Sequence, residues 1–411
     1  TAVALGKMIA GVSYQSYYPI TPASDESVFI EDNQYLDSLI KAEYFYELVK
    51  NGKVSKNLII EEKDGFVRLK RGIIVHQSED EISAIGSAIG AALTGARAST
   101  STSGPGFSLM VEFLGWAGRN EVPVVITHYQ RAAPSTGLPT KSEQGDLLFA
   151  YFASHGTFPR LILASGDVEE TFYDVPKIFN YAEKYQIPAI HLLDKVVANS
   201  SMVLPYLDLK KIKIERGKIL TEKDLEKIKE YKRFLFTEDG ISPRVFFGEK
   251  GGIHWLTGDE SDEKGHITED PETRSKIMHK RMKKMETALK EIPKEDKIKI
   301  YGNEKAKTAI ISFGSPKGVI LDSLKVLNKL NEVKFIQVRL LQPYPVKEIK
   351  EALENVEFLI DVEMNINGQL DFLNRAFVKR GSDVRIYKIT GRPIFLDELS
   401  FCLLYIVISF K

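Results

Sequence analysis

Three adjacent carboxylates, Glu79, Asp80 and Glu81, precede an apolar helical pattern and are the first candidates for acid–base chemistry. A carboxylate at such a point can hydrogen-bond a ring nitrogen and exchange a proton with it. The same residues also have a structural interpretation, because Ser78 and Glu81 fit a capping box as N-cap and N3. Acidic side chains also interact favourably with the dipole at a helix N-terminus. The local pattern taken alone favours the capping interpretation.

A second candidate is the segment Tyr18-Pro19-Ile20-Thr21-Pro22, which lies where an early strand should end. Its two prolines fix the backbone φ angle on both sides of Thr21, so the threonine hydroxyl would lose little freedom on binding a ligand. A rigid turn ahead of a helix at residues 24–27 explains the same pattern, and the local sequence slightly favours that turn.

A third candidate is Arg131, which follows the apolar run 122–127 and precedes the uncharged loop 132–140. A guanidinium in this position is suited to bidentate capture of a substrate carboxylate. A structural salt bridge to the acidic helix start is equally consistent with the sequence. The nearby segment 103–106, Ser-Gly-Pro-Gly, lacks both a Walker lysine and the dinucleotide fingerprint, so a phosphate site is not favoured there.

The elements that must position these residues follow a βαβ rhythm. Short β-branched runs alternate with helical patterns from residue 72 to residue 195, which is typical of a parallel sheet. Strands are expected at residues 73–75, 98–103, 122–127, 161–164 and 187–193, helical stripes at 82–93 and 168–182, and a Gly-Pro-Gly turn at 104–106. In such a sheet the loops after the strand ends form the ligand crevice.

We therefore predict an α/β fold with two parallel-sheet α/β domains. The first spans residues 1–203, and a smaller one spans residues 305–411 with strands near 309–313, 335–340, 358–362 and 384–388. Residues 204–304 between them are highly charged and are expected to form a connector with a basic helix at 275–289.

Composition limits the possible functions. With 56 basic and 56 acidic residues the formal charge is zero, so nucleic acids and anionic membranes are not expected partners. No apolar run reaches the roughly 20 residues of a membrane span. The seven histidines lack zinc-site spacing and no metal site is expected. The single cysteine, Cys402, cannot supply the thiolates of an iron–sulfur cluster, so any electron carrier is expected on a partner.

The chain carries no signal peptide pattern, which predicts a cytoplasmic location, and its start at Thr1 suggests that a leading segment is missing.

Taken together, these motifs resemble the alpha subunits of 2-oxoacid:ferredoxin oxidoreductases in both order and spacing. The motifs that carry the resemblance are Tyr-Pro-Ile-Thr-Pro at 18–22, Glu-Asp-Glu-Ile at 79–82, Thr-Ser-Gly-Pro-Gly-Phe-Ser-Leu-Met at 102–110, Pro-Ser-Thr-Gly-Leu-Pro-Thr at 134–140, Gly-Ser-Pro at 314–316, Val-Glu at 362–363 with Gly-Gln-Leu at 368–370, and Gly-Arg-Pro at 391–393. The resemblance covers nearly the whole chain and is to the archaeal type with an elaborated connector.

The resemblance implies the identity of both domains and of one catalytic residue. The first domain would be a thiamine diphosphate-binding-like domain that carries the pyrimidine-binding module, and the second would be a transketolase C-terminal-like domain. The family's pyrimidine glutamate falls on Glu81 and not on Glu79, because Glu81 keeps the family's spacing to Gly90. By the same match Tyr18 and Pro19 would contact the cofactor.

The resemblance also implies the substrate site, the partners and the reaction. Thr21 and Arg131 fall on the family's substrate-binding positions. A beta subunit would hold the diphosphate, its Mg2+ and an iron–sulfur cluster, and a gamma subunit, ferredoxin and coenzyme A are further expected partners. The complex would convert a 2-oxoacid, pyruvate or 2-oxoglutarate, to acyl-CoA, CO2 and reduced ferredoxin, and this chain alone would be inactive.

The sequence departs from the family pattern in three places. Ala132-Ala133 replaces two glycines of many relatives, and the charged stretch 28–70 separates motifs that are closer elsewhere. The third expected departure is the lack of the gamma domain that some archaeal members carry fused ahead of this module. Two alternatives stay open at this point, a thiamine-dependent dehydrogenase or transketolase-like subunit and a non-catalytic homologue. The sequence selects neither the preferred 2-oxoacid nor the number of alpha–beta units.

Overall fold

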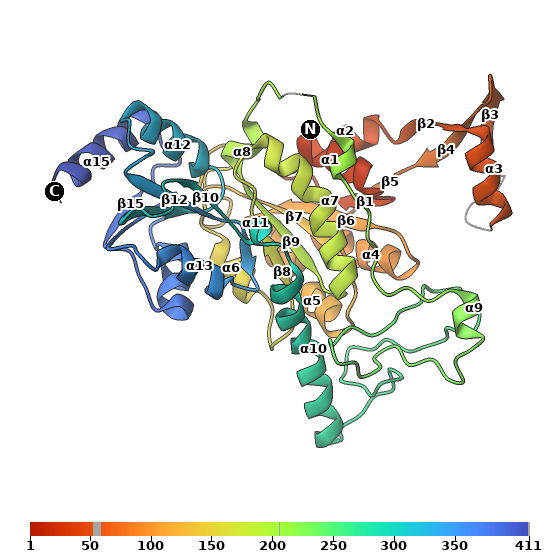
Figure 1. The fold of residues 1–411 in the computed structure, drawn as a ribbon. Coiled ribbons are helices and arrows are strands. Elements are labelled where there is room, and N and C mark those ends of the chain that lie inside the picture. The colour runs from red at the N-terminus through yellow and green to blue at the C-terminus, as the bar shows by residue number, and fades with distance from the viewer. Residues whose placement is uncertain (52–58, 205, 410–411) are drawn as a thin grey trace.

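The larger sheet of the protein carries the loops that contain all the candidate residues. In the computed structural model, which describes residues 1–51, 59–204 and 206–409, this sheet has seven strands in the order β13-β8-β9-β7-β6-β1-β5 (Figure 1). They are β1 (Tyr14–Tyr17), β5 (Ile74–Gln77), β6 (Ala98–Ser103), β7 (Val125–Gln130), β8 (Leu161–Leu163), β9 (Ala189–Asp194) and β13 (Leu340–Gln342). Only the edge strand β13 is antiparallel to its neighbour among these pairs.

Helices cover both faces of this sheet. They are α1 (Ala2–Ala10), α2 (Ser24–Asp32), α4 (Glu81–Leu93), α5 (Gly104–Arg119), α6 (Leu147–Phe152), α7 (Val168–Tyr185) and α8 (Lys195–Asn199). Alternating strand residues enter opposite cores, because successive side chains of a strand point to opposite faces. Ile126 and Ile190 pack in the core that contains α4 and α5, whereas Val125 and Ala189 pack in the core that contains α7. The candidate residues therefore lie at the edge of a sheet that is buried on both sides.

The second sheet has five strands in the order β10-β12-β11-β14-β15. These are β10 (Ile298–Gly302), β11 (Thr308–Ser312), β12 (Val333–Val338), β14 (Phe358–Glu363) and β15 (Val384–Tyr387), with helices α11 (Lys294–Lys297), α12 (Pro316–Val326), α13 (Val346–Leu353), α14 (Gln369–Leu373), the π-helical segment η3 (Asn374–Val378) and α15 (Leu396–Ser409). The predicted α/β class is confirmed, and β11, β12, β14 and β15 are parallel as expected.

Two strands of this region cross the expected domain limits. β10 pairs antiparallel with β12 although it lies ahead of residue 305, and β13 leaves the second sheet to pair with β8 of the first. The two sheets are thus joined by a strand as well as by loops. A bilayer span would need a longer apolar helix than any in the described part of the chain.

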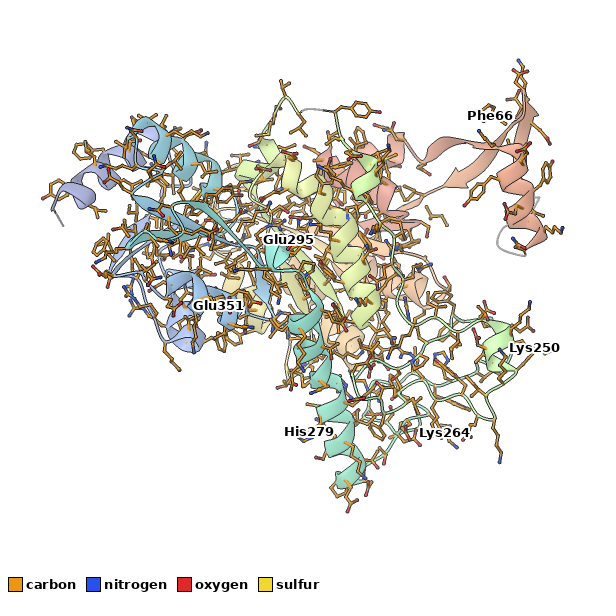
Figure 2. All side chains as sticks on the ribbon, in the orientation of Figure 1. Phe66, Lys250, Lys264, His279, Glu295 and Glu351 are labelled. Atoms are coloured by element: carbon orange, nitrogen blue, oxygen red, sulfur yellow. The ribbon has the colours of Figure 1, made fainter. Side chains whose placement is uncertain are left out.

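The segment that separates the early motifs forms an arm that projects from the first domain (Figure 1). It contains a three-stranded antiparallel sheet in the order β2-β4-β3, formed by β2 (Tyr35–Lys41), β3 (Ile59–Lys63) and β4 (Phe66–Gly72), with helix α3 (Ala42–Lys50) against it. Phe45 and Val67 are fully buried between them, whereas Phe66 is 41% exposed on the arm (Figure 2). The sequence did not predict this sheet.

The Gly-Pro-Gly segment at 104–106 is the first turn of α5 and not the turn expected between strand and helix. Ser103 is the N-cap in an extended conformation, and Pro105 occupies the helix start, where its missing N–H leaves no bond unmade. The helix therefore begins directly at the end of β6.

The charged connector is ordered around a basic helix, as predicted, although most of it is irregular. Ahead of α11 and β10 its regular elements are η2 (Leu209–Lys211), α9 (Glu222–Leu225) and α10 (Pro271–Glu291). Figure 2 shows His279 on α10 and Lys250 and Lys264 on the surrounding segments. Lys280 and Lys284 of α10 each place Nζ 2.6 Å from a different carboxylate oxygen of Glu121. All three side chains are buried, so this ion cluster fastens the connector to the first domain.

Replacing Glu121 by Gln should destabilise the chain by about 3 to 5 kcal/mol, because two buried ammonium groups would lose their counter-charge. Burial alone would raise the pKa of Glu121, but Lys280 and Lys284 outweigh it and hold that pKa well below its ordinary value. The contribution is therefore present above the unfolded pKa and is lost as the pH falls through the folded pKa. Denaturant unfolding checks this, with Glu286→Gln as the control, since Glu286 pairs with Lys283 on the exposed side of the same helix. Equal unfolding midpoints for the two variants would contradict the assignment.

Candidate functional site

The three candidate residues follow the carboxyl ends of strands in one sheet. β1 lies between β5 and β6, and β7 lies beside β6. Glu81 comes after β5, Thr21 after β1 and Arg131 directly after β7. Since these strands are parallel, their carboxyl ends meet at the same edge, which is where ligands bind in open α/β sheets.

Glu81 is the first residue of α4, and its side chain is not used for capping. The N-cap is Asp80, whose Oδ1 accepts a hydrogen bond of 2.7 Å from the backbone N–H of Ser83. The capping box predicted from Ser78 and Glu81 is therefore wrong, because the chain enters the helix two residues later than that pattern requires. This leaves the Glu81 carboxylate available to another group.

The Glu81 side chain is nevertheless buried, with 5% of the residue exposed. It lies against the start of α5, where an added Cβ at Gly106 would collide with the carboxylate of Glu81 and the hydroxyl of Thr102. In the described part of the chain no basic residue forms an ion pair with Glu81. Burial raises the pKa of Glu81, its own backbone N–H lowers it, and the neighbouring Asp80 raises it further.

Arg131 connects the loop after β7 to the loop after β1. Its Nη1 donates a hydrogen bond of 2.6 Å to the backbone carbonyl of Thr21, and its Nε is buried without a hydrogen-bond partner. The residue is 5% exposed, and burial lowers its pKa while Asp146 raises it. No carboxylate of the described residues lies within ion-pair distance of Arg131, so the salt bridge to the acidic helix start is not formed. The guanidinium remains available to an anionic ligand.

Thr21, Tyr18 and Pro19 are all exposed at this edge, with Tyr18 40% exposed. The structure thus brings Thr21 and Arg131 into direct contact, although through the threonine carbonyl and not through its hydroxyl. The first turn of α5 lies against both Glu81 and Asp146, because Gly106 contacts Glu81 and Gly104 faces the carboxylate of Asp146.

A buried polar network, which the sequence did not predict, supports the loop that carries Thr21. Lys7 forms an ion pair with Glu26 and donates a hydrogen bond of 3.0 Å to Gln15. The Tyr129 hydroxyl donates a hydrogen bond of 2.7 Å to the other oxygen of Glu26. Because these residues come from α1, β1, α2 and β7, the network fixes the loops that carry Thr21 and Arg131 relative to each other.

The loop after Arg131 is anchored by contacts with the first domain and with the second domain. Oδ2 of Asp146 accepts a hydrogen bond at 2.9 Å from Nε2 of the buried His128, and the backbone N–H of Asp146 donates one at 3.1 Å to Oε1 of Gln130. Gln144 is fully buried and reaches the second domain: its backbone N–H donates to the Met364 carbonyl at 2.7 Å and its Nε2 to the Phe313 carbonyl at 2.8 Å. The second domain therefore fixes the shape of this loop.

One further cation lies at the same edge. Lys195, the first residue of α8, follows β9 directly, and its pKa is lowered by burial, raised by Asp25 and lowered by Arg131. The described residues include no cluster of three or more His, Cys, Asp or Glu side chains arranged to hold a metal ion. The edge thus combines a buried carboxyl group with two buried cations.

Known proteins are similar to this chain over nearly its whole length. Residues 5–280 match the family described as pyruvate flavodoxin/ferredoxin oxidoreductase, thiamine diP-binding. A 2-oxoacid:ferredoxin oxidoreductase 1 subunit alpha from Sulfurisphaera tokodaii is 48% identical over 409 residues, which are 99% of this chain and 60% of that one. A 2-oxoglutarate synthase subunit KorA from Methanothermobacter thermautotrophicus is 30% identical over 399 residues, covering 97% of this chain and 94% of that one.

A solved structure is similar as well. The 2-oxoglutarate:ferredoxin oxidoreductase from Magnetococcus marinus, with 2-oxoglutarate, coenzyme A and succinyl-CoA bound, superposes with a TM-score of 0.81 at 30% identity, over 98% of this chain and 64% of that one. The chain spans about 60% of the length of the Sulfurisphaera relative. These likenesses, in sequence and in structure, confirm the resemblance, and the chain belongs to the pyruvate flavodoxin/ferredoxin oxidoreductase family as an alpha subunit of the 2-oxoacid:ferredoxin oxidoreductase type.

Proposed function

We propose that this chain supplies half of a thiamine diphosphate site and the 2-oxoacid pocket of a 2-oxoacid:ferredoxin oxidoreductase. The complex would oxidatively decarboxylate a 2-oxoacid such as pyruvate or 2-oxoglutarate, transfer the acyl group to coenzyme A and pass the electrons to ferredoxin. The observation that carries the proposal is the buried Glu81 carboxyl group, without an ion-pair partner in the described chain, at the same sheet edge as the buried Arg131.

The residues at this edge fit the pyrimidine end of the cofactor. Glu81 is buried, keeps its carboxylate out of the helix cap and has a raised pKa, so it can share a proton with a ring nitrogen at Oε1 or Oε2. Tyr18 and Pro19, which are exposed at the same sheet edge, would contact the ring. Thiamine diphosphate, when bound, supplies the carbanion that attacks the 2-oxo carbon and takes up electrons on decarboxylation.

The substrate would be oriented by two residues of this chain. Arg131 presents a planar set of donors that matches a carboxylate, and its contact with the Thr21 carbonyl fixes the direction of the guanidinium. The Thr21 hydroxyl would donate a hydrogen bond to the same carboxylate or to the adjacent 2-oxo oxygen. Because both are held by the buried Lys7–Glu26–Tyr129 network, little freedom is lost on binding.

The remaining chemistry belongs to partners in this proposal. A beta subunit would bind the diphosphate with Mg2+ and carry the iron–sulfur cluster, because this chain has one cysteine. A gamma subunit, separate or fused, is a further expected partner. A cytoplasmic location is part of the proposal, since reduced ferredoxin and an unpaired thiol both suit a reducing compartment.

Gly106→Ala should lower activity of the assembled complex about 100-fold, because displacement of a catalytic group by about 1 Å has an effect of that order. The added methyl group would push the Glu81 carboxylate away from the start of α5. Steady-state turnover at saturating thiamine diphosphate measures the effect. Gly318→Ala is the matched control, since no atom lies within 4 Å of an added Cβ there. Similar activity of the two variants would show that the packing of Glu81 on Gly106 is not needed.

The reaction class is tested with the complex of this chain and its beta subunit. A panel of 2-oxoacids is offered with coenzyme A and an artificial one-electron acceptor, and acyl-CoA and acceptor reduction are both measured. We expect two acceptor molecules to be reduced for each acyl-CoA formed, because the decarboxylation releases two electrons, and we expect a strict need for coenzyme A. Acyl transfer to lipoamide or to a sugar acceptor instead would point to a thiamine-dependent dehydrogenase or transketolase-like enzyme, and inactivity of a cofactor-loaded complex would point to a non-catalytic homologue.

A further inference from the structure

A small polar pocket lies at the side of the first domain opposite to the candidate functional site. It has a volume of about 280 Å³ and lies between the end of α5, the loop 155–158, the connector segment 258–260 and α10 (Figure 1). Helix α5 starts at the carboxyl end of β6 with Gly104 and ends at Arg119, ahead of β7. At about 1.5 Å per residue, its 16 residues place Arg119 about 22 Å from Gly104. The pocket is therefore separate from the site around Glu81.

Two buried arginines face this pocket. Arg119 has 13% of its side chain exposed, and Arg281 of α10 is 4% exposed. Nε and Nη2 of Arg119 and Nε of Arg281 are buried without a hydrogen-bond partner, whereas Nη1 of Arg119 donates a hydrogen bond of 2.7 Å to Oδ1 of Asn120. Burial lowers the pKa of Arg119 to about 10, although Glu260 raises it. Three guanidinium nitrogens therefore lack an acceptor among the described residues.

The nearest counter-charge, Glu260, is shared among three arginines. Its Oε1 lies 2.6 Å from Nη2 of Arg281 and 3.9 Å from Nη2 of Arg119. Its Oε2 lies 3.0 Å from Nη1 of the exposed Arg274. Both carboxylate oxygens are thus engaged by Arg281 and Arg274, and Arg119 receives no hydrogen-bond acceptor from Glu260.

Other acidic side chains near the pocket do not complete the cluster. Glu121 and Asp259 raise the pKa of Arg119, but neither forms an ion pair with Arg119 or Arg281 in the part of the chain that the structure describes. Glu121 is already paired with two lysines of α10. Glu112 lines the pocket, but it is exposed and lies about two turns before Arg119 on α5. The unpartnered nitrogens therefore match an anion from outside the chain.

We propose that this pocket binds a phosphate group, of free phosphate or of a phosphomonoester, through Arg119 and Arg281. A phosphomonoester offers three acceptor oxygens where a carboxylate offers two, which matches the three unpartnered nitrogens. The pocket is smaller than the roughly 300 to 1,000 Å³ of sites for drug-sized ligands, so it suits one small anionic group. Because α5 belongs to the first domain and α10 to the connector, the bound group would hold the two together. This inference does not depend on the proposed function.

The test introduces a negative charge into the pocket without changing the arginines. Gly258 lines the pocket, and no atom lies within 4 Å of a Cβ added there. Gly258→Asp would place a carboxylate beside the arginines, and Gly258→Asn is a neutral control of similar size. The assembled, thiamine diphosphate-loaded complex is titrated with sodium phosphate in a calorimeter at constant ionic strength, with sodium chloride as the reference titration.

We expect a Kd for phosphate of about 1 mM in the wild type and in Gly258→Asn, as for a ligand held by a few charge-assisted hydrogen bonds. The Kd should be at least about tenfold higher in Gly258→Asp, because the new carboxylate would occupy the same donors. Arg119→Met should raise the Kd by about the same factor. Arg380→Met is the control for that variant, because Arg380 pairs with Asp383 in the second domain.

A second titration with glycerol 3-phosphate distinguishes the two sources of the phosphate group. Tighter binding than that of inorganic phosphate would identify a phosphomonoester as the ligand, and equal or weaker binding would identify free phosphate. If Arg119→Met does not fold, the two Gly258 variants still decide the question. Equal phosphate affinities of Gly258→Asp and Gly258→Asn, or a phosphate titration that does not differ from the chloride titration, would overturn the proposal.

Discussion

Replacing Glu81 by Gln should reduce turnover of every 2-oxoacid by about 100- to 10,000-fold, the range typical for loss of acid–base catalysis. Glutamine keeps the shape that packs on Gly106, so the complex should still assemble and bind thiamine diphosphate. It cannot share a proton with the pyrimidine in the way proposed for the buried Glu81 carboxyl group, whose pKa is raised by burial. The steady-state rate of acceptor reduction measures the loss of turnover. The amount of thiamine diphosphate bound per complex shows whether assembly and cofactor binding are kept.

Glu79→Gln is the matched control for that variant. Glu79 is an exposed neighbour on the same acidic segment, so its replacement should leave turnover within about twofold, as for other surface changes. Near-normal activity of Glu81→Gln would remove Glu81 from the catalytic site. Equal losses in Glu79→Gln would mean that the charge of the whole segment matters and not one residue.

Arg131→Lys should raise the KM for all 2-oxoacids about 10- to 100-fold, because a point charge replaces a planar bidentate donor. The lysine would also lose the geometry of the bond to the Thr21 carbonyl, which holds the guanidinium in place. The effect should appear mainly in kcat/KM, since binding of the substrate carboxylate is what is weakened. Initial rates with pyruvate and 2-oxoglutarate measure it, with Arg274→Lys on the exposed side of α10 as the control.

Unchanged kinetics of Arg131→Lys would mean that Arg131 has only a structural role, connecting the loops after β1 and β7. Arg131→Lys should affect mono- and dicarboxylates alike, because both carry the carboxylate next to the 2-oxo group.

The sequence predicted the parts of this fold that depend on local periodicity. The strand at 98–103 and the stripes that became α4 and α7 were located from residue spacing alone, because burial against a sheet imposes a strict apolar pattern. The positions of Thr21 and Arg131 after strand ends followed from the same rhythm, and their contact is seen in the structure. The roles assigned to them, and to Glu81, Tyr18 and Pro19, remain predictions.

Features that depend on distant pairing could not be predicted. The arm between α2 and β5 is an antiparallel sheet whose segments read as mixed charged sequence, so no clear alternation identified its strands. The Lys7–Glu26–Tyr129 network joins residues more than 100 positions apart. The register that places Lys195 beside Arg131 is likewise a property of strand order, which a single sequence does not give.

The capping box failed for a local reason. Both Ser78 and Asp80 are residue types that can act as an N-cap, and which of them does so depends on where β5 ends and the helix begins. This difference matters for function, because a capping glutamate would have its carboxylate engaged by the backbone. With Asp80 as the cap, Glu81 can turn toward Gly106 and the expected cofactor position.

The most direct test of the account is a reconstitution from separately purified subunits. This chain and its beta subunit are each assayed alone with thiamine diphosphate, Mg2+, 2-oxoglutarate, coenzyme A and an artificial acceptor, and are then mixed. The account predicts no turnover by either chain alone and full turnover on mixing, with turnover about 100- to 10,000-fold lower when the mixed chain is Glu81→Gln. Turnover by this chain alone, or by the beta subunit without it, would contradict the claim that the active site is shared between them.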